Sequence, residues 1–337
     1  MRLLVAMVVL AGCGRLRFDS AADADPGSDA PDGNATCGGR DCEGGACVMD
    51  VCQPAVLVET TDLPVMMALD GDTLYWTGDL DTINGCSRSG CATPTVLASG
   101  EIGAHGIALD DTTIYWTNYQ DSTPSGVRAC SKTSCSPTTL QGGQIGPFEL
   151  RISGNTLYWT DFNGGELHRH GTSPAGLDVV LATGVSTAWG LVVVNDIVYF
   201  TVNNGTGRVR SCPSGGCAAG GDPVALSQVN PNGITAANGS LYWTNVANGE
   251  VHTCVIGSCV DDNVIAYTSQ PQQIVVDQAN VYWTDPGTMS VYSCPLGGCP
   301  VSGPHLVADN QPDVSAIVVD ETHLYWGRDG AVMLLVK

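Results

Sequence analysis

A short aromatic signature recurs seven times along this chain of 337 residues. Each copy has a tyrosine followed by Trp or Phe, six copies continue with threonine, and successive tyrosines are 40 to 43 residues apart. Within each unit, β-branched and aromatic runs alternate with turn residues, so the period predicts the blades of a β-propeller rather than a helical solenoid. The signatures are Tyr75-Trp76-Thr77, Tyr115-Trp116-Thr117, Tyr158-Trp159-Thr160, Tyr199-Phe200-Thr201, Tyr242-Trp243-Thr244, Tyr282-Trp283-Thr284 and Tyr325-Trp326-Gly327.

The order of strands within a unit predicts how the ring closes. Residues 55–58 match the fourth strand of the other units, whereas the C-terminal segment 331–336 matches a third strand. The last blade is then completed by the first strand of the domain, which leaves no unpaired edge at that junction. We therefore expect an all-β fold, a seven-bladed β-propeller over residues 55–337 with four strands per blade.

Ten cysteines fall into the repeat as pairs, each enclosing four residues between a third and a fourth strand. Cysteines that flank a tight hairpin are well placed for a local disulfide. We interpret the pairs as structural staples of the outer hairpins rather than as redox-active sites. They are Cys86/Cys91, Cys130/Cys135, Cys212/Cys217, Cys254/Cys259 and Cys294/Cys299.

The N-terminal residues predict export and membrane anchoring. Residues 1–12 contain Arg2 and a short apolar run, and they end in Leu-Ala-Gly before Cys13, as in a secretory signal peptide. This segment resembles the lipobox of bacterial lipoproteins, in which the cysteine is lipidated and begins the mature chain. The resemblance implies a lipid anchor at Cys13 in the bacterial cell envelope, with the outer membrane as the expected location. An ordinary signal peptide with an accidental cysteine is the alternative.

Two short segments separate this anchor from the repeat. Residues 13–36 are acidic and poor in apolar side chains, which is typical of a flexible tether. Residues 37–54 form a Cys-rich module, which in an exported chain predicts two disulfides whose connectivity stays open, with a four-cysteine zinc site as the alternative. Its four cysteines, spaced five apart, are Cys37, Cys42, Cys47 and Cys52.

Charge and motifs exclude several classes of function. The chain has 34 Asp+Glu against 13 Lys+Arg and a net charge of −21, whereas a protein that neutralises phosphates needs clustered Lys and Arg. We expect no nucleic-acid partner. Phosphate-loop, hydrolase-elbow and zinc-protease motifs are missing, so we expect no cofactor and no metal. His168 and His170 are interpreted as a surface pair on an outer strand, and a shared metal ion is the alternative.

The Tyr-Trp-Thr-Asp form of the signature, at 158–161 and 282–285, resembles the YWTD propeller family known from lipoprotein-receptor ectodomains. The resemblance covers most of residues 55–337. It implies a binding or scaffolding role and brings no active site, because the family uses these residues structurally. The chain departs from the family in its seven copies, where the family has six blades. It also departs at the fourth signature position, which in some copies is Gly78, Asn118, Val202 or Arg328.

The most varied position of the repeat lies ten residues before the signature tyrosine, and we name it the mouth position. We expect it on the face where loops between blades open around the channel, with Phe148 and Trp189 in adjacent inter-blade loops. Together with Tyr119 and Phe162, they place the off-repeat aromatics in blades two to four, which favours recognition of sugars or apolar side chains. A core plug of the channel is the alternative. The mouth positions are Val65, His105, Phe148, Trp189, Asn232, Gln272 and Ser315.

The sequence leaves three functional classes. We expect a surface-anchored, non-catalytic binding module for an extracellular, periplasmic or envelope ligand, either a protein or a glycan. A hydrolase or lyase with a metal in the central channel is one alternative, for which His105, Glu149 and Asp313 would have to converge. A purely structural envelope protein is the other. The candidate ligand-binding residues are Trp189, Phe148, Tyr119, Phe162, His105, Asn232 and Gln272.

Overall fold

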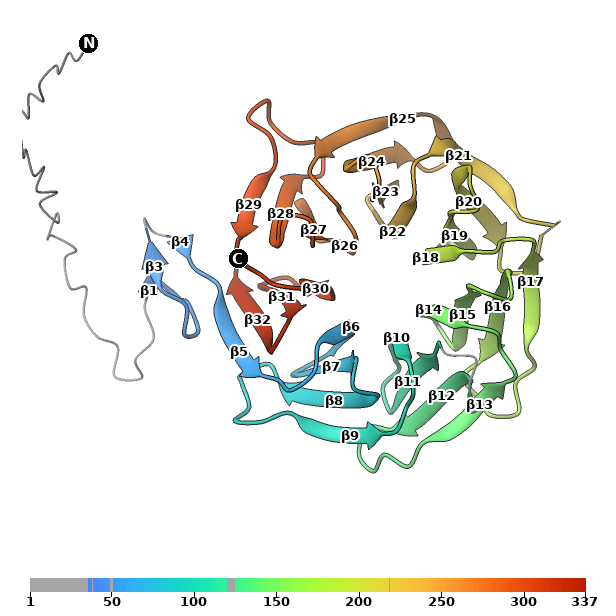
Figure 1. The fold of residues 1–337 in the computed structure, drawn as a ribbon, viewed down its shortest axis with the longest axis horizontal. Coiled ribbons are helices and arrows are strands. Elements are labelled where there is room, and N and C mark those ends of the chain that lie inside the picture. Colours follow the sequence, from blue (N-terminus) through green and yellow to red (C-terminus); the bar gives the residue numbers. More distant parts are fainter. Residues whose placement is uncertain (1–35, 38, 49–50, 120–124, 218) are drawn as a thin grey trace, which may run out of the picture.

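The chain folds into a closed ring of seven antiparallel four-stranded sheets around a central channel (Figure 1). This computed structural model describes residues 36–337 except 38, 49–50, 120–124 and 218. The seven-bladed propeller is thus confirmed, with consecutive strands in six blades running in order from the channel to the rim. The predicted signal peptide, Cys13 and all of the tether except residue 36 lie outside the described residues. The described part contains no helix with the length and hydropathy that crossing a bilayer requires.

The strands of each blade surround one signature, which forms the second strand. Blade one has β6 (Pro64–Asp70), β7 (Thr73–Gly78), β8 (Thr82–Ser87) and β9 (Thr95–Ser99). Blade two has β10 (Ala104–Leu109), β11 (Thr113–Asn118), β12 (Gly126–Ser131) and β13 (Thr138–Gly142), and blade three has β14 (Pro147–Ser153), β15 (Thr156–Asp161), β16 (Glu166–Gly171) and β17 (Val179–Thr183). Blade four has β18 (Ala188–Val194), β19 (Ile197–Val202), β20 (Gly207–Pro213) and β21 (Asp222–Gln228).

The remaining strands complete the ring. Blade five has β22 (Pro231–Ala237), β23 (Ser240–Asn245), β24 (Glu250–Val255) and β25 (Ser258–Tyr267), and blade six has β26 (Ile274–Val276), β27 (Asn280–Asp285), β28 (Ser290–Pro295) and β29 (His305–Ala308). Blade seven has β30 (Ile317–Val319), β31 (His323–Arg328), β32 (Ala331–Val336) and, as its outer strand, β5 (Ala55–Glu59). The first strand of the domain therefore closes the last blade, as predicted, with Ala55 opposite Leu334.

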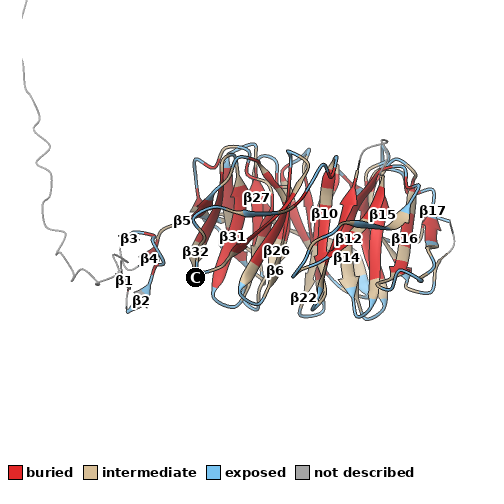
Figure 2. Ribbon diagram, turned by 90° about the horizontal axis from the view of Figure 1, so that it is seen from below, coloured by how far each residue is buried: buried red, intermediate tan, exposed pale blue. Residues whose placement is uncertain are grey.

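Neighbouring blades form the core by packing face to face. Each signature strand is buried on both sides, because Tyr75 packs toward the next blade while Trp76, which is fully buried, packs toward the previous one. Seen from the side of the ring, most strand residues are buried or intermediate, and exposure is concentrated in the loops (Figure 2). A strand covered on both faces reads as a continuous apolar run, which explains why the signature lacks the usual alternation.

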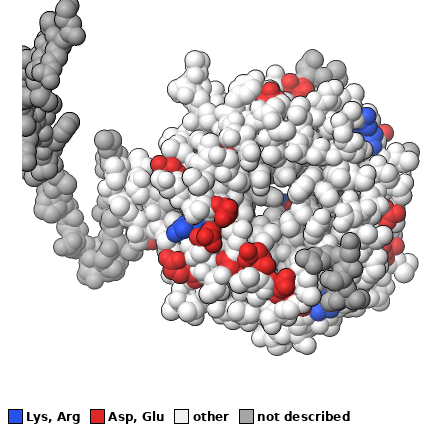
Figure 3. Space-filling view, in the orientation of Figure 1, with Lys and Arg blue, Asp and Glu red and all other residues white. Residues whose placement is uncertain are grey.

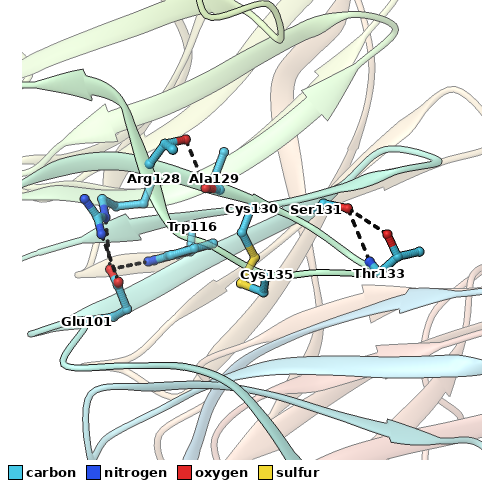
Figure 4. Close-up of a disulfide and its surroundings, with 9 residues drawn as sticks. Glu101, Trp116, Arg128, Ala129, Cys130, Ser131, Thr133 and Cys135 are labelled. Atoms are coloured by element: carbon cyan, nitrogen blue, oxygen red, sulfur yellow. Dashed lines mark hydrogen bonds and ion pairs between the residues drawn. A yellow bond between two sulfur atoms is a disulfide. The ribbon is translucent and has the colours of Figure 1, made fainter.

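In five of the six tryptophan signatures the indole nitrogen donates to a residue fifteen positions earlier, whereas Trp76 Nε1 is buried without a partner among the described residues. Trp116 Nε1 donates to Glu101 Oε2 at 3.0 Å, and the same carboxylate accepts hydrogen bonds from Arg128 (Figure 4). The one signature without a tryptophan has Phe200, and the residue fifteen positions before it is Val185, fully buried in the same core. In this blade the acceptor is absent together with the donor, which avoids the cost of an unpaired buried polar group. The other pairs are Trp159–Gln144, Trp243–Gln228, Trp326–Gln311 and Trp283–Thr268.

The signature threonine joins each blade to the next. In blade two, Thr117 Oγ1 accepts from the Gly106 N–H of its own first strand at 2.8 Å and donates to the Phe148 carbonyl of blade three at 2.6 Å. Equivalent donations reach the mouth-position carbonyl at five successive junctions, over 2.6–3.2 Å. The repeat thus fixes the backbone of the mouth position through its carbonyl, which leaves the side chain free to vary.

Disulfides close the outer hairpins of five blades, and the predicted pairing is confirmed in each. Cys130 bonds to Cys135 and so joins the third strand β12 to the loop before β13 (Figure 4). The other bonded pairs are Cys86–Cys91, Cys212–Cys217, Cys254–Cys259 and Cys294–Cys299.

The hairpin cysteines differ from the prediction in their exact placement. The first cysteine of each pair lies within the third strand and is buried, rather than in the connection after it. The second is half-buried, and it lies in the connecting loop at Cys91, Cys135, Cys217 and Cys299 but within the long fourth strand β25 at Cys259. Each bond therefore ties the hairpin tip to the covered strand of its blade, as a structural staple requires.

The N-terminal module contains two further disulfides. Cys37 pairs with Cys47 and Cys42 with Cys52, so all four sulfur atoms are engaged and none is a free thiolate for zinc. The module consists of β1 (Thr36–Cys37), β2 (Arg40–Asp41), β3 (Cys47–Val48) and β4 (Val51–Cys52).

The module rests against blade seven. Its cysteines pack on Leu335 and Val336 of β32, and Glu43 Oε1 lies 3.1 Å from Nε2 of His323. These contacts lie at the end of the ring where β5 begins and β32 ends.

The interpretation of His168 and His170 as a surface pair is wrong. Both are only 2% exposed, because the ring of His168 stacks on the signature indole of Trp159, with 5.1 Å between centroids. The two side chains hold separate partners: His168 Nδ1 lies 2.9 Å from Asp178 Oδ1, whereas His170 Nδ1 lies 2.5 Å from the Gly171 carbonyl. They are parts of the blade core.

Candidate ligand site at one mouth of the channel

The first strands of blades one to five carry a bulge where they meet the mouth. In β14, Pro147 pairs with Asp161 and Leu150 with Trp159, so one extra residue is inserted between them. The same shift occurs in β10, β18 and β22. Phe148 and Trp189 therefore lie within first strands and not in inter-blade loops as predicted. A bulge re-aims side chains at a strand end, which makes the mouth position a presentation site.

Seven equivalent blades act as internal references for each position. We name the residue nine before the signature tyrosine the packing position and the residue seven before it the channel position. All seven channel positions line one cavity of about 420 Å³ in the middle of the ring. The packing positions are Met66, Gly106, Glu149, Gly190, Gly233, Gln273 and Ala316, and the channel positions are Ala68, Ala108, Arg151, Val192, Thr235, Val275 and Val318.

Blade three departs from the other blades at both positions. A Cβ at Gly106 would lie 2.4 Å from the Phe148 carbonyl oxygen, and at Gly190 2.6 Å from that of Asn232, so glycine suits this contact between first strands. Blade three instead buries Glu149, 2% exposed, and projects Arg151 into the channel, where it is the sole charged group that the described residues contribute to the lining. Sequence reasoning considered Glu149 only for catalysis and missed Arg151, although the comparison of channel positions singles it out.

The off-repeat aromatics form one contiguous cluster. Phe148 lies at its centre, with its ring centroid 4.8 Å from Trp189, 5.2 Å from Tyr119, 5.7 Å from Phe162 and 3.6 Å from the stacked ring of His105. Edge-to-face pairs dominate, which is the geometry that aromatic quadrupoles favour. Residues from blades two, three and four thus meet at one sector of the mouth, as the repeat alignment predicted.

Burial divides the cluster into a floor and a rim. Phe148 is 8% exposed, whereas Tyr119, Phe162 and Trp189 are partly exposed. The indole Nε1 of Trp189 is buried without a hydrogen-bond partner among the described residues. A buried donor left unpaired costs about 1–3 kcal/mol, so this N–H is an unsatisfied polar group beneath the rim.

Asn232 and Gln272 take no part in the aromatic cluster. Their main-chain carbonyls accept the ring-joining bonds from Thr201 and Thr244, at 2.6 and 2.7 Å. The described residues show no side-chain hydrogen bond for either amide. These two predicted residues belong to blades five and six, whereas the aromatic cluster is confined to blades two to four.

Burial shifts the protonation of two groups beneath the cluster. It lowers the pKa of His105 to about 3, helped by the nearby positive charge of Arg151, and Nδ1 has no hydrogen-bond partner in the described part of the chain. Burial also raises the pKa of the Glu149 carboxyl, against the opposing effect of the ion pair with Arg151. Asp313 is exposed in the loop before β30, and within the described ranges no hydrogen bond or ion pair joins it to either group.

The face in Figure 3 is hollowed near its centre, with acidic side chains gathered at the lower left and few basic ones. At the hairpin end, a separate groove of about 760 Å³ lies between blades five to seven and includes Lys337, which is paired with Asp277 at 2.5 Å. Equivalent cations, Arg88 and Lys132, also bridge to aspartates of the preceding blade, so this pairing is a structural device.

Comparison with known proteins agrees on the fold. No protein-family model matches the chain, and no curated protein matches it. Among solved structures, a nidogen/laminin complex aligns with TM-score 0.55 at 19% identity over 69% of this chain and 95% of that one. Virginiamycin B lyase from Staphylococcus aureus aligns with TM-score 0.67 at 14% identity, covering 85% and 99% of the two chains. The WD40 β-propeller domain of Doa1 gives 0.68 at 11%, covering 84% and 95%. At these identities the likeness establishes a β-propeller, a fold shared by binding modules and by a lyase.

Proposed function

We propose that the protein is a surface-anchored, non-catalytic binding module whose ligand site is the aromatic sector of the mouth in blades two to four. One observation carries this proposal. The residues that depart from the repeat at its mouth, packing and channel positions converge on one sector, although the fold is built without them in other blades. Side chains that the architecture does not need, placed on a rigid frame, are typical of binding surfaces.

The path of the chain indicates which end of the ring would face the membrane. β5 begins beside the end of β32, and the Lys337 N–H bonds to the carbonyl of Thr322 in the hairpin between β30 and β31. The mouth positions lie at the other end of the first strands. The Cys-rich module, which packs on the end of β32, therefore lies at the end opposite the aromatic sector. A lipid at Cys13, which we propose as the anchor in the outer membrane, would leave the mouth turned toward an extracellular or periplasmic partner.

A lyase is the second candidate, favoured by the alignment with virginiamycin B lyase along 85% of the chain. The pKa of His105 weighs against it, because an efficient general base titrates near the working pH. An imidazole whose pKa is about 3 is a weak base. Asp313 also has no hydrogen bond or ion pair to Glu149 among the described residues. Recognition without catalysis therefore suits these groups better.

The test is a binding screen of the purified chain against extracellular proteins, envelope polymers and glycans, repeated with Trp189→Ala. We expect at least a tenfold loss of affinity, because an aromatic anchor contributes about 2 kcal/mol. Tyr267→Ala is the matched control, since Tyr267 is 67% exposed on the outer strand β25. Unchanged binding by Trp189→Ala, or lost binding by the control alone, would place the site elsewhere.

A further inference from the structure

Arg151 and Glu149 form an ion pair whose two halves differ in access. The Glu149 side chain is 2% exposed, whereas that of Arg151 is 37% exposed and lines the channel. Arg151 Nη1 also donates to the Leu150 carbonyl at 3.0 Å. Among the described residues, Arg151 is the sole polar partner of the Glu149 carboxylate. A ligand in the channel therefore reaches the cation and not its counterion.

The fold itself does not explain this pair. Six other blades pack with Met, Gly, Gln or Ala at the packing position and with Ala, Val or Thr at the channel position. A buried ion pair is weak support for stability, because desolvation of both charges offsets their attraction. The pair lies on the same strand as Phe148, the centre of the aromatic cluster.

From this juxtaposition we infer that the site binds a carboxylate carried on an apolar or aromatic stem, with the acid at Arg151 and the stem between the aliphatic channel wall and the aromatic cluster. The inference rests on the proposed function and names the ligand chemistry of the same site. The lining favours such a stem over a sugar, because beside the guanidinium its polar side chains are only those of Thr235 and Gln273 among the described residues, and the rest is apolar.

Binding then exchanges one counterion for another. When the ligand carboxylate engages Arg151, Glu149 loses its partner and takes up a proton from solvent, which leaves a neutral carboxylic acid in the buried position. Burial already raises the pKa of Glu149 in the free protein. The groups facing it are Arg151 on its own strand and His105 on β10, which stays uncharged near neutral pH. We therefore expect one proton to be absorbed per ligand bound.

Phenylacetate and its neutral isostere phenylacetamide are suitable probes, titrated calorimetrically into the full chain. We expect phenylacetate to bind at least tenfold more tightly, with a proton uptake that appears as a dependence of the heat on buffer ionisation. Affinity for phenylacetate should fall as pH rises, by up to tenfold per unit. Equal affinity for the two probes, no measurable binding of phenylacetate at millimolar concentration, or no proton uptake would overturn the inference.

Three variants test the exchange of counterions directly. Glu149→Gln removes the competing charge, so phenylacetate should bind more tightly and without proton uptake. Arg151→Met with Glu149→Gln removes both charges, which avoids an unpaired buried carboxylate, and should abolish the preference for the acid. Arg328→Met is the matched loss of an arginine outside the site. Weaker binding by Glu149→Gln alone, or a retained preference in the double variant, contradicts the exchange.

Two further comparisons identify the source of the carboxylate and separate a failure of the carboxylate inference from a failure of the proposed binding site. An N-acetylated peptide ending in phenylalanine, with a free or an amidated C-terminus, tests a chain terminus against the free small acid. If both acids bind more tightly than their neutral forms and the peptide acid binds more tightly than phenylacetate, the ligand is the end of a protein chain. If both probes bind equally and both require Trp189, the aromatic site stands and the carboxylate inference fails.

Discussion

The hydroxyl of Ser315 donates a hydrogen bond to the main-chain carbonyl of Pro64, 251 residues away in the sequence, and so joins the last blade to the first. At five other junctions a signature threonine donates to the mouth-position carbonyl of the next blade, but in blade seven the threonine is replaced by Gly327, and the acceptor, Pro64, directly precedes the mouth position Val65. A Cβ at Gly327 would lie 2.7 Å from the Pro64 Cβ, which leaves no space for threonine. The hydroxyl is instead supplied by the mouth position of the same blade.

Replacing Ser315 with Ala should therefore loosen the closure of the ring. We expect the free energy of unfolding to fall by about 1 kcal/mol, the usual net contribution of one hydrogen bond. Urea denaturation measures the change. Ser153→Ala, at an exposed residue, is the control. Equal losses of unfolding free energy in the two variants would show that the hydrogen bond from Ser315 to Pro64 adds no stability.

The pairing of tryptophan with its acceptor predicts a compensating double substitution. Phe200→Trp alone buries an indole N–H next to Val185 without an acceptor, which costs about 1–3 kcal/mol. Val185→Gln on this background should recover about 1 kcal/mol or more, although Val185→Gln alone destabilises. A double-mutant cycle measures the coupling, and purely additive losses would contradict the proposed bond.

His105 should make the fold sensitive to acid. In the unfolded chain its pKa is near 6.5, whereas burial lowers it to about 3 in the fold, so between these values the unfolded chain binds a proton that the folded chain does not. The free energy of unfolding therefore decreases as pH falls through this window, by up to about 1.4 kcal/mol per unit. Glu149, whose pKa is raised, acts in the opposite direction below that raised value.

The variant His105→Phe isolates this contribution. Because Phe keeps the stacking on Phe148 but does not titrate, the pH slope of its unfolding free energy in the upper part of this window, from about pH 6.5 to about pH 5, should be shallower than that of the unmodified protein. Chemical denaturation at several pH values gives both slopes. Parallel slopes would mean that another group carries the acid response.

Anchoring at Cys13 predicts release by a single substitution. Cys13→Ser removes the sulfur that would receive the lipid, so the exported chain should leave the membrane fraction. Fractionation with detergent-free washes measures this. A Cys13→Ser variant that stays with the membranes would contradict the lipoprotein interpretation.

The architecture was predictable from the sequence because it depends on periodicity. Seven signatures 40 to 43 residues apart give seven blades, and the strand-like segments at 55–58 and 331–336 leave only one way to close the last one. These features are repeated, so each copy tests the interpretation of the others.

Only the tertiary structure decided which side chains meet. One extra residue in the bulge of β14 changes the direction of the side chains around it, and so places Phe148 in the cluster, Glu149 between blades and Arg151 in the channel. A shift of one residue changes the face on which a strand presents its side chains. Such a shift has no compositional signature. The periodic pattern therefore determined the frame, whereas packing between blades determined the contents of its mouth.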